Sequence, residues 1–157
     1  MTRLLPYFAY GSNLNPPQME ERCPGHRVLG RARLDRHTIR FRGYGRDWEG
    51  AVATIEPHDG ETVWGALFEL TAEHYAALDE YEGYDGPGAS TNLYDRVAIT
   101  VVREADGSEV SALTYVMRPD TEGPPSRIYR DAILAGMRHH GLPRETIAAL
   151  EAIDTAD

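Results

Sequence analysis

Apolar and polar residues alternate in several short segments of the chain, and helical spacing replaces this alternation in one middle segment and again near the end. The alternating segments, rich in β-branched and aromatic residues, predict strands at residues 5–10, 28–34, 37–42, 50–56, 62–70, 94–103 and 109–117. Helical spacing predicts helices at residues 72–82, 125–140 and 143–153. Strands that come mostly before helices, without regular βαβ alternation, favour an α+β fold over a doubly wound sheet.

Glycine and proline mark the connections between these elements. Asp106-Gly107 lies between two apolar runs and predicts a hairpin turn. Longer connections rich in Gly, Pro, Asp or Thr occur at residues 43–50, 83–92 and 118–125. Loops of this kind often carry a functional site, although many are merely solvated.

The helix predicted at residues 72–82 has recognisable ends. Thr71 is a favourable N-cap, and Glu73 in the first turn complements the positive end of the helix dipole. Gly83 supplies the residue just past the C-terminus, where glycine is preferred. The helix is therefore expected to end at Glu82.

Helical spacing places Glu82 on the same face as the apolar residues Tyr75 and Leu78, whereas Asp79 and Glu80 are expected to face water. A carboxylate that is both buried and at a helix C-terminus has a raised pKa, because desolvation and the helix dipole both disfavour its charge. Such a group suits general base chemistry.

The residues alone nevertheless favour a structural role for Glu82, because most glutamates at helix ends are not catalytic. In that role its carboxylate accepts hydrogen bonds from neighbouring backbone or from an arginine such as Arg96.

Near the start of the chain, the sequence YFAY at 7–10 runs into GSNL at 11–14. Aromatic residues favour a strand, Gly11 tolerates positive φ, and Ser12 and Asn13 can bond their own backbone in a turn. Consecutive amide N–H groups in such a turn can hold an anion. An ordinary strand end followed by a polar turn is the alternative.

Three further segments follow this turn: VWGALFEL at 63–70, LDEYEGY at 78–84 and PPSRIY at 124–129. Taken in this order, the segments resemble the gamma-glutamylcyclotransferase family, over nearly the whole chain. The resemblance implies an α+β fold centred on a small β-barrel with flanking helices. It also implies cleavage of a γ-glutamyl amide by the substrate's own α-amine, which releases 5-oxoproline and a free amine.

The resemblance also assigns roles to residues. It implies that Glu82 is the catalytic base, and that the following residues bind the small-molecule γ-glutamyl substrate: Tyr10, Gly11, Ser12, Asn13, Leu14, Tyr94 and Tyr129. Tyr94 and Tyr129 can equally be core aromatics with satisfied hydroxyl groups. The reaction needs a base and oxyanion donors, so neither a cofactor nor a metal is expected.

Composition and charge add limits. The chain has 157 residues and 41% hydrophobic composition, so we expect a single domain over residues 1–157. All 16 basic residues are arginine, which excludes a lysine Schiff base, a pyridoxal phosphate anchor and a lysine phosphate loop. The net charge of −9 argues against a nucleic-acid partner. Arginines that alternate with apolar residues predict the solvated face of a strand, namely Arg31, Arg33, Arg40 and Arg42.

No apolar run is long enough to cross a membrane, and the N-terminus lacks the pattern of a secretion signal. The single cysteine, Cys23, has no partner for an internal disulfide. These features predict a cytoplasmic protein without a membrane partner. The sequence leaves the oligomeric state open, with a homodimer among the expectations.

Other motifs give weaker evidence for a function. Ser12 and Ser90 lack the surroundings of a nucleophilic serine, and Cys23 with His26 lacks a second pair of metal ligands.

The connection at residues 83–92 is longer than in the animal members of the family and is expected to flank the leaving amine. Alternative functions are a related cyclotransferase acting on a γ-glutamylated amine metabolite or polyamine, and a non-catalytic γ-glutamyl-binding module.

Overall fold

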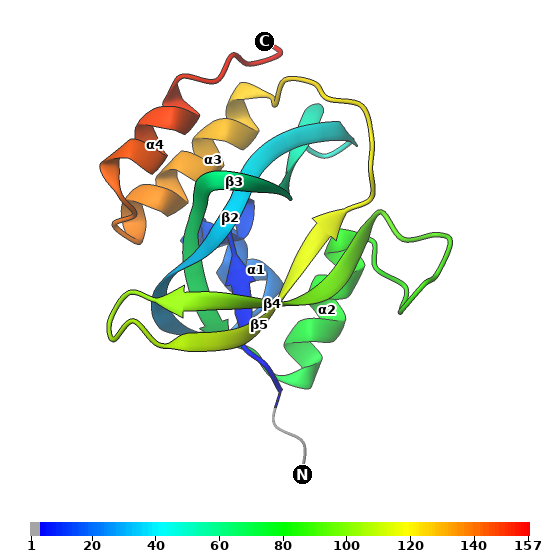
Figure 1. Ribbon diagram of the computed structural model, residues 1–157. Coiled ribbons are helices and arrows are strands. Elements are labelled where there is room, and N and C mark those ends of the chain that lie inside the picture. Colours follow the sequence, from blue (N-terminus) through cyan, green and yellow to red (C-terminus); the bar gives the residue numbers. More distant parts are fainter. Residues whose placement is uncertain (1–3) are drawn as a thin grey trace.

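A closed β-barrel forms the centre of the computed structural model, which describes residues 4–157 (Figure 1). Within these residues the strands follow the order β1-β3-β2-β4-β5 around the barrel. Their bounds are β1 Tyr7–Ala9, β2 Arg27–Gly45, β3 Gly50–Glu69, β4 Tyr94–Arg103 and β5 Glu109–Met117. The helices outside the barrel are the 3₁₀ helix η1 Ser12–Leu14, α1 Pro16–Arg22, α2 Ala72–Glu82, α3 Arg127–His139 and α4 Arg144–Glu151. The predicted α+β barrel fold is confirmed.

The short strand β1 closes the barrel. It pairs antiparallel with β3 over its whole length, and Tyr7 pairs in parallel with Leu113 of β5. The amide of Leu113 also donates to the carbonyl of Pro6 at 2.8 Å. The residues that follow β1 are therefore delivered to one end of the barrel, where η1 begins.

Strands β2 and β3 are longer than predicted, because each joins two predicted strands into one. The register slips where they were expected to break, since Asp35 pairs with Thr62 but His37 pairs with Pro57. Arg36 has φ of 59° at this bulge. The sequence signalled the irregularity correctly, but the strands bend there instead of ending.

Apolar side chains of all the strands and helices pack into one core inside and around the barrel. Phe8 and Leu67 are almost fully buried. Of the alternating arginines of β2, Arg31 is exposed, whereas Arg33, Arg40 and Arg42 are half-buried, so the predicted solvated face is only partly open to water. Arg31 reaches the carbonyl of Gly141 and the carboxylate of Glu104.

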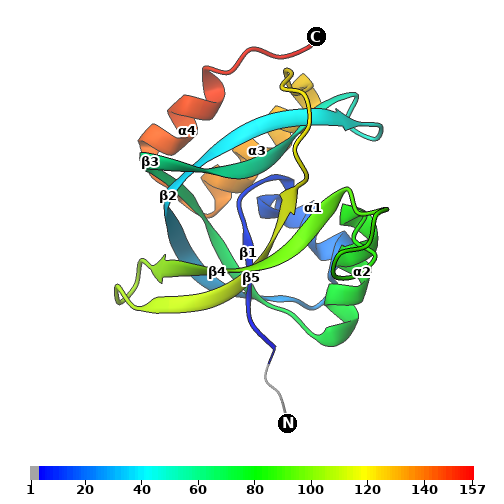
Figure 2. The same cartoon turned by 45° about the vertical axis from the view of Figure 1, so that its right-hand side comes forward.

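The helices cover opposite sides of the barrel. Figure 2 shows α3 and α4 together on the side of β2 and β3, and α1 and α2 on the other. The two C-terminal helices begin and end close to their predicted bounds, and α2 spans its predicted residues. The helices η1 and α1 were not predicted. Asn15 begins α1 by accepting a hydrogen bond from the amide of Gln18, and proline follows it at the first helical position.

Helix α3 packs directly on the backbone of η1. A Cβ atom on Gly136 would lie 2.4 Å from the carbonyl carbon of Leu14 and 2.6 Å from the nitrogen of Asn15. The Asn15 side chain donates to the carbonyl of Ala132, and a ring nitrogen of His140 lies 3.2 Å from the Leu14 carbonyl oxygen. Glycine at position 136 therefore sets how closely α3 holds the turn after β1.

This contact predicts the effect of Gly136→Ala. At an open helical position the change would stabilise the protein by about 1 kcal/mol, because alanine is the better helix former. Here the added methyl group overlaps backbone, and overpacking costs about 1 to 3 kcal/mol. We expect a lower melting temperature in thermal unfolding. Ala135→Ser, at an exposed position on α3, is the control and should change little, whereas a raised melting temperature for Gly136→Ala would contradict the close contact.

Candidate active site

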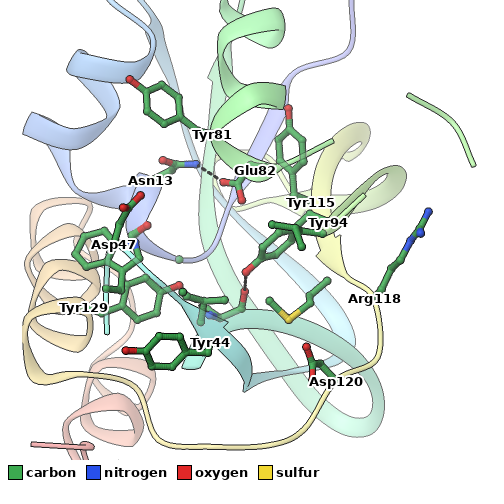
Figure 3. A pocket seen from close by; sticks show the side chains of 18 of the residues that line it. Asn13, Tyr44, Asp47, Tyr81, Glu82, Tyr94, Tyr115, Arg118, Asp120 and Tyr129 are labelled. Carbon is green, nitrogen blue, oxygen red and sulfur yellow. Dashed lines mark hydrogen bonds between the residues drawn. The ribbon is translucent and has the colours of Figure 1, made fainter. Parts of the chain in front are cut away.

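A cavity of about 780 Å³ opens at the end of the barrel where β1 runs into η1. Its walls come from β1, η1, α1, the end of β2, the start of β3 and the turn between them, the end of α2, strands β4 and β5, and α3 (Figure 3). Segments distant in sequence thus meet around one space.

Most of the residues predicted for the site line this cavity: Tyr10, Gly11, Ser12, Asn13, Glu82, Tyr94 and Tyr129. Leu14 does not line it. Its side chain is fully buried, and the neighbouring backbone packs against Gly136 of α3. Leu14 therefore supports the turn from behind rather than facing a ligand.

Glu82 is placed by the ends of α2. Thr71 caps the helix by accepting from the amide of His74 at 3.1 Å, and Gly83 adopts the left-handed conformation with φ of 67°, both as predicted. The apolar residues Tyr75 and Leu78 of the same face are buried. The last residue of α2 is thereby turned toward the cavity.

The carboxylate of Glu82 is largely withdrawn from water, with its side chain 17% exposed. It accepts a hydrogen bond from Asn13 Nδ2 at 3.2 Å, and Arg22 Nη1 lies 3.9 Å from its Oε1. Burial raises the pKa of Glu82 to about 7, against the smaller opposite effects of Arg22 and Asn13. The predicted rise of this pKa is confirmed, and such a group exchanges protons near neutral pH.

The surroundings of Glu82 differ from the sequence interpretation in two ways. Asp79 does not face water, because it accepts hydrogen bonds from Arg96 and from the hydroxyl of Tyr115. Arg96 is therefore occupied, and the cation next to Glu82 is Arg22. The error arose because a helix end packed against a barrel buries a wider face than spacing alone indicates.

The side chain of Asn13 is fixed from both sides. Its Nδ2 donates to Glu82 and to the hydroxyl of Tyr7 at 2.9 Å. Its Oδ1 accepts from Gln18 Nε2 at 3.0 Å and from Arg22 Nη1 at 3.1 Å. Because both ends of the amide have partners of the correct type, Asn13 holds the Glu82 carboxylate in one orientation.

At the opposite wall, two tyrosines bind the backbone of one residue, Ala53. The hydroxyl of Tyr94 donates to the carbonyl of Ala53 at 2.7 Å, whereas the hydroxyl of Tyr129 accepts from the Ala53 amide at 2.8 Å. Tyr129 therefore keeps its own proton for another acceptor, and Tyr94 presents only lone pairs. Both tyrosines line the cavity and pack against the core, and a role of either in substrate binding stays a prediction.

The turn at Gly11 supplies backbone donors. Ser12 and Asn13 are the first residues of η1, and the first amides of a helix have no partner within it. Gly11 has φ of −118°, so positive φ does not explain this glycine. A Cβ there would lie 3.5 Å from Ala53 Cβ and 3.9 Å from the Tyr129 hydroxyl. The absent side chain leaves room for a ligand beside that hydroxyl.

Several cavity residues were missed in the sequence. Arg22 lies on α1, which was not predicted, although Asn15-Pro16 was a recognisable helix start. The end of β2 and the turn that follows it contribute residues 44–48, and the segment after β5 contributes residues 118–120; both fall in connections that the sequence marked as candidate loops. Of the loop at 83–92, only Asn92 lines the cavity, so most of that loop lies outside it.

Within residues 4–157, no three His, Cys, Asp or Glu side chains come together in a way that could hold a metal ion. In the same part of the chain, the helices are too short or too polar to cross a membrane.

The family model described as gamma-glutamyl cyclotransferase, AIG2-like, matches residues 7–132. The chain belongs to this family. Gamma-glutamylcyclotransferase of Homo sapiens is 31% identical over 155 residues, covering 96% of this chain and 79% of the relative. That of Mus musculus is 32% identical over 152 residues, covering 94% and 78%. A solved structure named gamma-glutamyl cyclotransferase has a TM-score of 0.89 at 30% identity and covers 98% of this chain and 89% of its own.

The site of this family member predicts a pH dependence of its stability. The folded protein holds the Glu82 proton up to about pH 7, whereas the unfolded chain releases it near the ordinary value of 4.5. The stability that the bound proton contributes is fully present below the unfolded-state pKa of 4.5. It is lost as the pH rises through the folded-state pKa of about 7. The free energy of unfolding should therefore fall by about 2 to 3 kcal/mol between about pH 5 and about pH 8.

Glu82→Gln should remove this contribution, because the amide does not titrate. Urea unfolding of both proteins at the two pH values gives the comparison, and the variant should gain stability relative to the wild type at the higher pH. Glu80→Gln, at an exposed position of α2, is the matched control and should follow the wild type. Equal pH dependence in wild type and Glu82→Gln would show that Glu82 is already ionised in the folded protein at low pH.

Proposed function

We propose that this protein is a gamma-glutamylcyclotransferase that converts a γ-glutamyl amide into 5-oxoproline and a free amine. The observation that carries the proposal is the Glu82 carboxylate, which has a pKa of about 7 and lies in a cavity also bordered by the amides of η1. A base and oxyanion donors on one cavity are the groups that the reaction requires. Family membership supports the same activity.

Glu82 begins the reaction as a base. The α-amine of a γ-glutamyl group is mostly an ammonium ion at neutral pH and cannot attack a carbonyl carbon until it loses a proton. The Glu82 carboxylate takes that proton, and its orientation is fixed by Asn13. A base with a pKa near the working pH can accept the proton and release it again.

The neutral α-amine then attacks the γ-carbonyl carbon, and the new C–N bond closes a five-membered ring. Negative charge develops on the carbonyl oxygen, where the amides of Ser12 and Asn13 and the proton of Tyr129 are the available donors. Breaking the old C–N bond releases the amine, which protonated Glu82 supplies with a proton. The α-nitrogen loses two protons and the departing nitrogen gains two, so the reaction is balanced without a cofactor.

The leaving amine occupies the mouth of the cavity in this proposal. Residues of the β2–β3 turn and of the segment after β5 line the mouth, among them Asp47 and Asp120 (Figure 3). Arg118 is occupied by Asp95 and the carbonyl of Ala89. The two carboxylates outnumber Arg46, which lines the cavity from the same turn, and together with the net charge of −9 they support neutral or cationic leaving amines over anionic ones.

Two alternatives stay open. The carboxylates at the mouth also suit a γ-glutamylated amine metabolite or polyamine, which is the same reaction with another amine. A non-catalytic γ-glutamyl-binding module is the other alternative, and the raised pKa of Glu82 argues against it because binding alone does not require a base. Incubation with γ-glutamyl-alanine and detection of 5-oxoproline by mass spectrometry separates the enzyme from the binding module. We further propose a cytoplasmic location, which cell fractionation can test.

The first kinetic prediction concerns Glu82→Gln. The amide keeps the shape of the side chain and its hydrogen bond with Asn13, but it cannot take a proton. We expect the turnover number to fall by about 10² to 10⁴-fold, the usual contribution of general acid–base catalysis, with substrate binding largely kept. Glu80→Gln is the control and should be nearly silent. Wild-type turnover by Glu82→Gln would remove Glu82 from the mechanism.

The second kinetic prediction concerns the substrate. Replacing γ-glutamyl by β-aspartyl, or acylating the α-amine, should abolish the reaction. The β-aspartyl compound cannot close the five-membered ring, and the acylated compound has no free nucleophile. A basic leaving amine should be accepted as well as alanine or better. Comparison of kcat/KM over such a panel is the measurement, and efficient turnover of the acylated compound would refute intramolecular cyclisation.

A further inference from the structure

Arg22 is a half-buried cation in the wall of the cavity, and the proposed reaction assigns it no role. It ends α1, and its side chain is 16% exposed. Its Nη1 donates to Asn13 Oδ1 at 3.1 Å and lies 3.9 Å from Glu82 Oε1. The guanidinium and the Glu82 carboxylate therefore present opposite charges side by side at one end of the cavity.

The guanidinium is held in place but is only partly used. Its Cζ lies 4.5 Å from the centre of the Tyr81 ring, a distance at which cation–π attraction fixes the group. Of its five N–H groups, the contact with Asn13 employs one. Among residues 4–157, the only buried side-chain nitrogen or oxygen without a partner is Nε of Arg130. The remaining donors of Arg22 are therefore accessible rather than sealed in the protein.

A γ-glutamyl group carries an ammonium and a carboxylate on the same carbon atom, so its two charges are also side by side. We propose that Arg22 binds the α-carboxylate of the substrate while Glu82 takes the proton from the α-amine. The proposal rests on the proposed cyclotransferase activity and adds the residue that recognises the glutamyl end. The adjacent pair of protein charges then matches the adjacent pair of substrate charges with opposite sign.

The geometry selects Arg22 among the nearby arginines. Arg96 is paired with Asp79, and Arg118 is paired with Asp95. Arg46 lines the cavity from the β2–β3 turn and is exposed. With the amine at Glu82, the carboxylate on the same carbon reaches the cation beside it, and guanidinium N–H groups match a carboxylate in pairs.

A substrate carboxylate near Glu82 needs such a cation. The tyrosines on which the Glu82 charge acts are Tyr7 of β1, Tyr10 just after it, Tyr94 of β4, Tyr115 of β5 and Tyr129 of α3, and burial raises the pKa of each of them. These hydroxyls are uncharged at neutral pH. Without Arg22, the substrate ammonium would be the counter charge of two carboxylates, and the α-carboxylate would lose it when Glu82 takes the proton.

The test removes the charge from the protein and from the substrate in turn. The protein change is Arg22→Met, which keeps a long side chain without charge. The substrate change replaces γ-glutamyl-alanine by 4-aminobutanoyl-alanine, which lacks only the α-carboxylate and still closes a five-membered lactam, 2-pyrrolidinone. Alanine release measures both reactions. Assays at about pH 9 keep Glu82 ionised in both proteins despite its raised pKa.

Arg22→Met should lower kcat/KM for γ-glutamyl-alanine by about 10 to 100-fold, the range for a lost hydrogen bond to a charged group. With 4-aminobutanoyl-alanine, the wild type and Arg22→Met should agree within about threefold, because the group that Arg22 binds is missing. Arg22→Lys should give intermediate activity on γ-glutamyl-alanine, since it keeps the charge but loses the paired donors. An equal loss on both substrates would overturn the proposal and leave Arg22 only as a positioning residue for Glu82 and Asn13.

Two controls complete the experiment. Arg27→Met removes an exposed arginine of β2 that pairs with Glu69, outside the cavity, and should leave both reactions unchanged. Thermal unfolding of each variant shows whether it is folded. Wild-type activity on γ-glutamyl-alanine tests the cyclotransferase itself: its absence would refute the proposed function, whereas activity combined with an equal loss on both substrates refutes only the role of Arg22.

Discussion

Keeping a carboxylate out of water is the constraint on which this site depends. Glu82 is drawn inward at the end of α2, and a buried carboxylate is unfavourable unless it is neutralised or hydrogen-bonded. Asn13 donates one hydrogen bond to the Glu82 carboxylate, and the guanidinium of Arg22 is a cation beside it, beyond hydrogen-bond distance. This support leaves the pKa near neutrality, because a closer ion pair would keep Glu82 permanently ionised and unable to hold a proton.

The supporting groups are themselves arranged by packing far from the chemistry. Asn13 lies on η1, whose backbone is pressed against Gly136 of α3. Helix α3 also carries Tyr129, which holds the amide of Ala53 on β3. The position of one helix thus sets both the donor to Glu82 and the opposite wall of the cavity, and small changes at Gly136 reach the site through backbone.

The sequence allowed the prediction of features that local chemistry determines. Helix α2 was predicted with correct ends, because Thr71 and Gly83 act on adjacent backbone, and the inward face with Glu82 followed from spacing. The side chains predicted to bind substrate were found around one cavity, apart from Leu14. Residue spacing alone did not indicate that the turn after β1, Glu82 at the end of α2 and Tyr129 of α3 form one site. The resemblance to a family supplied that prediction.

Other features depend on contacts between distant segments and were not predictable in the same way. Asp79 is inward because Arg96 and Tyr115 come from strands that pack on α2. Arg22 became a site residue only through α1, a helix of seven residues with weak periodicity. The join of four predicted strands into β2 and β3 depends on pairing across the barrel, which single-strand patterns do not specify.

The closure of the barrel also bears on how the protein reaches its active form. Strand β1 completes the sheet by meeting β5 through Tyr7 and Leu113, residues separated by most of the chain. Pairings between residues so far apart in sequence form slowly, because the chain loses much conformational entropy before the new contacts contribute favourable free energy. The residues after β1 take their places only once this pairing exists. Enzymatic activity should therefore appear late in refolding, after most of the secondary structure has formed. Its return should report on closure of the β-barrel more directly than circular dichroism does.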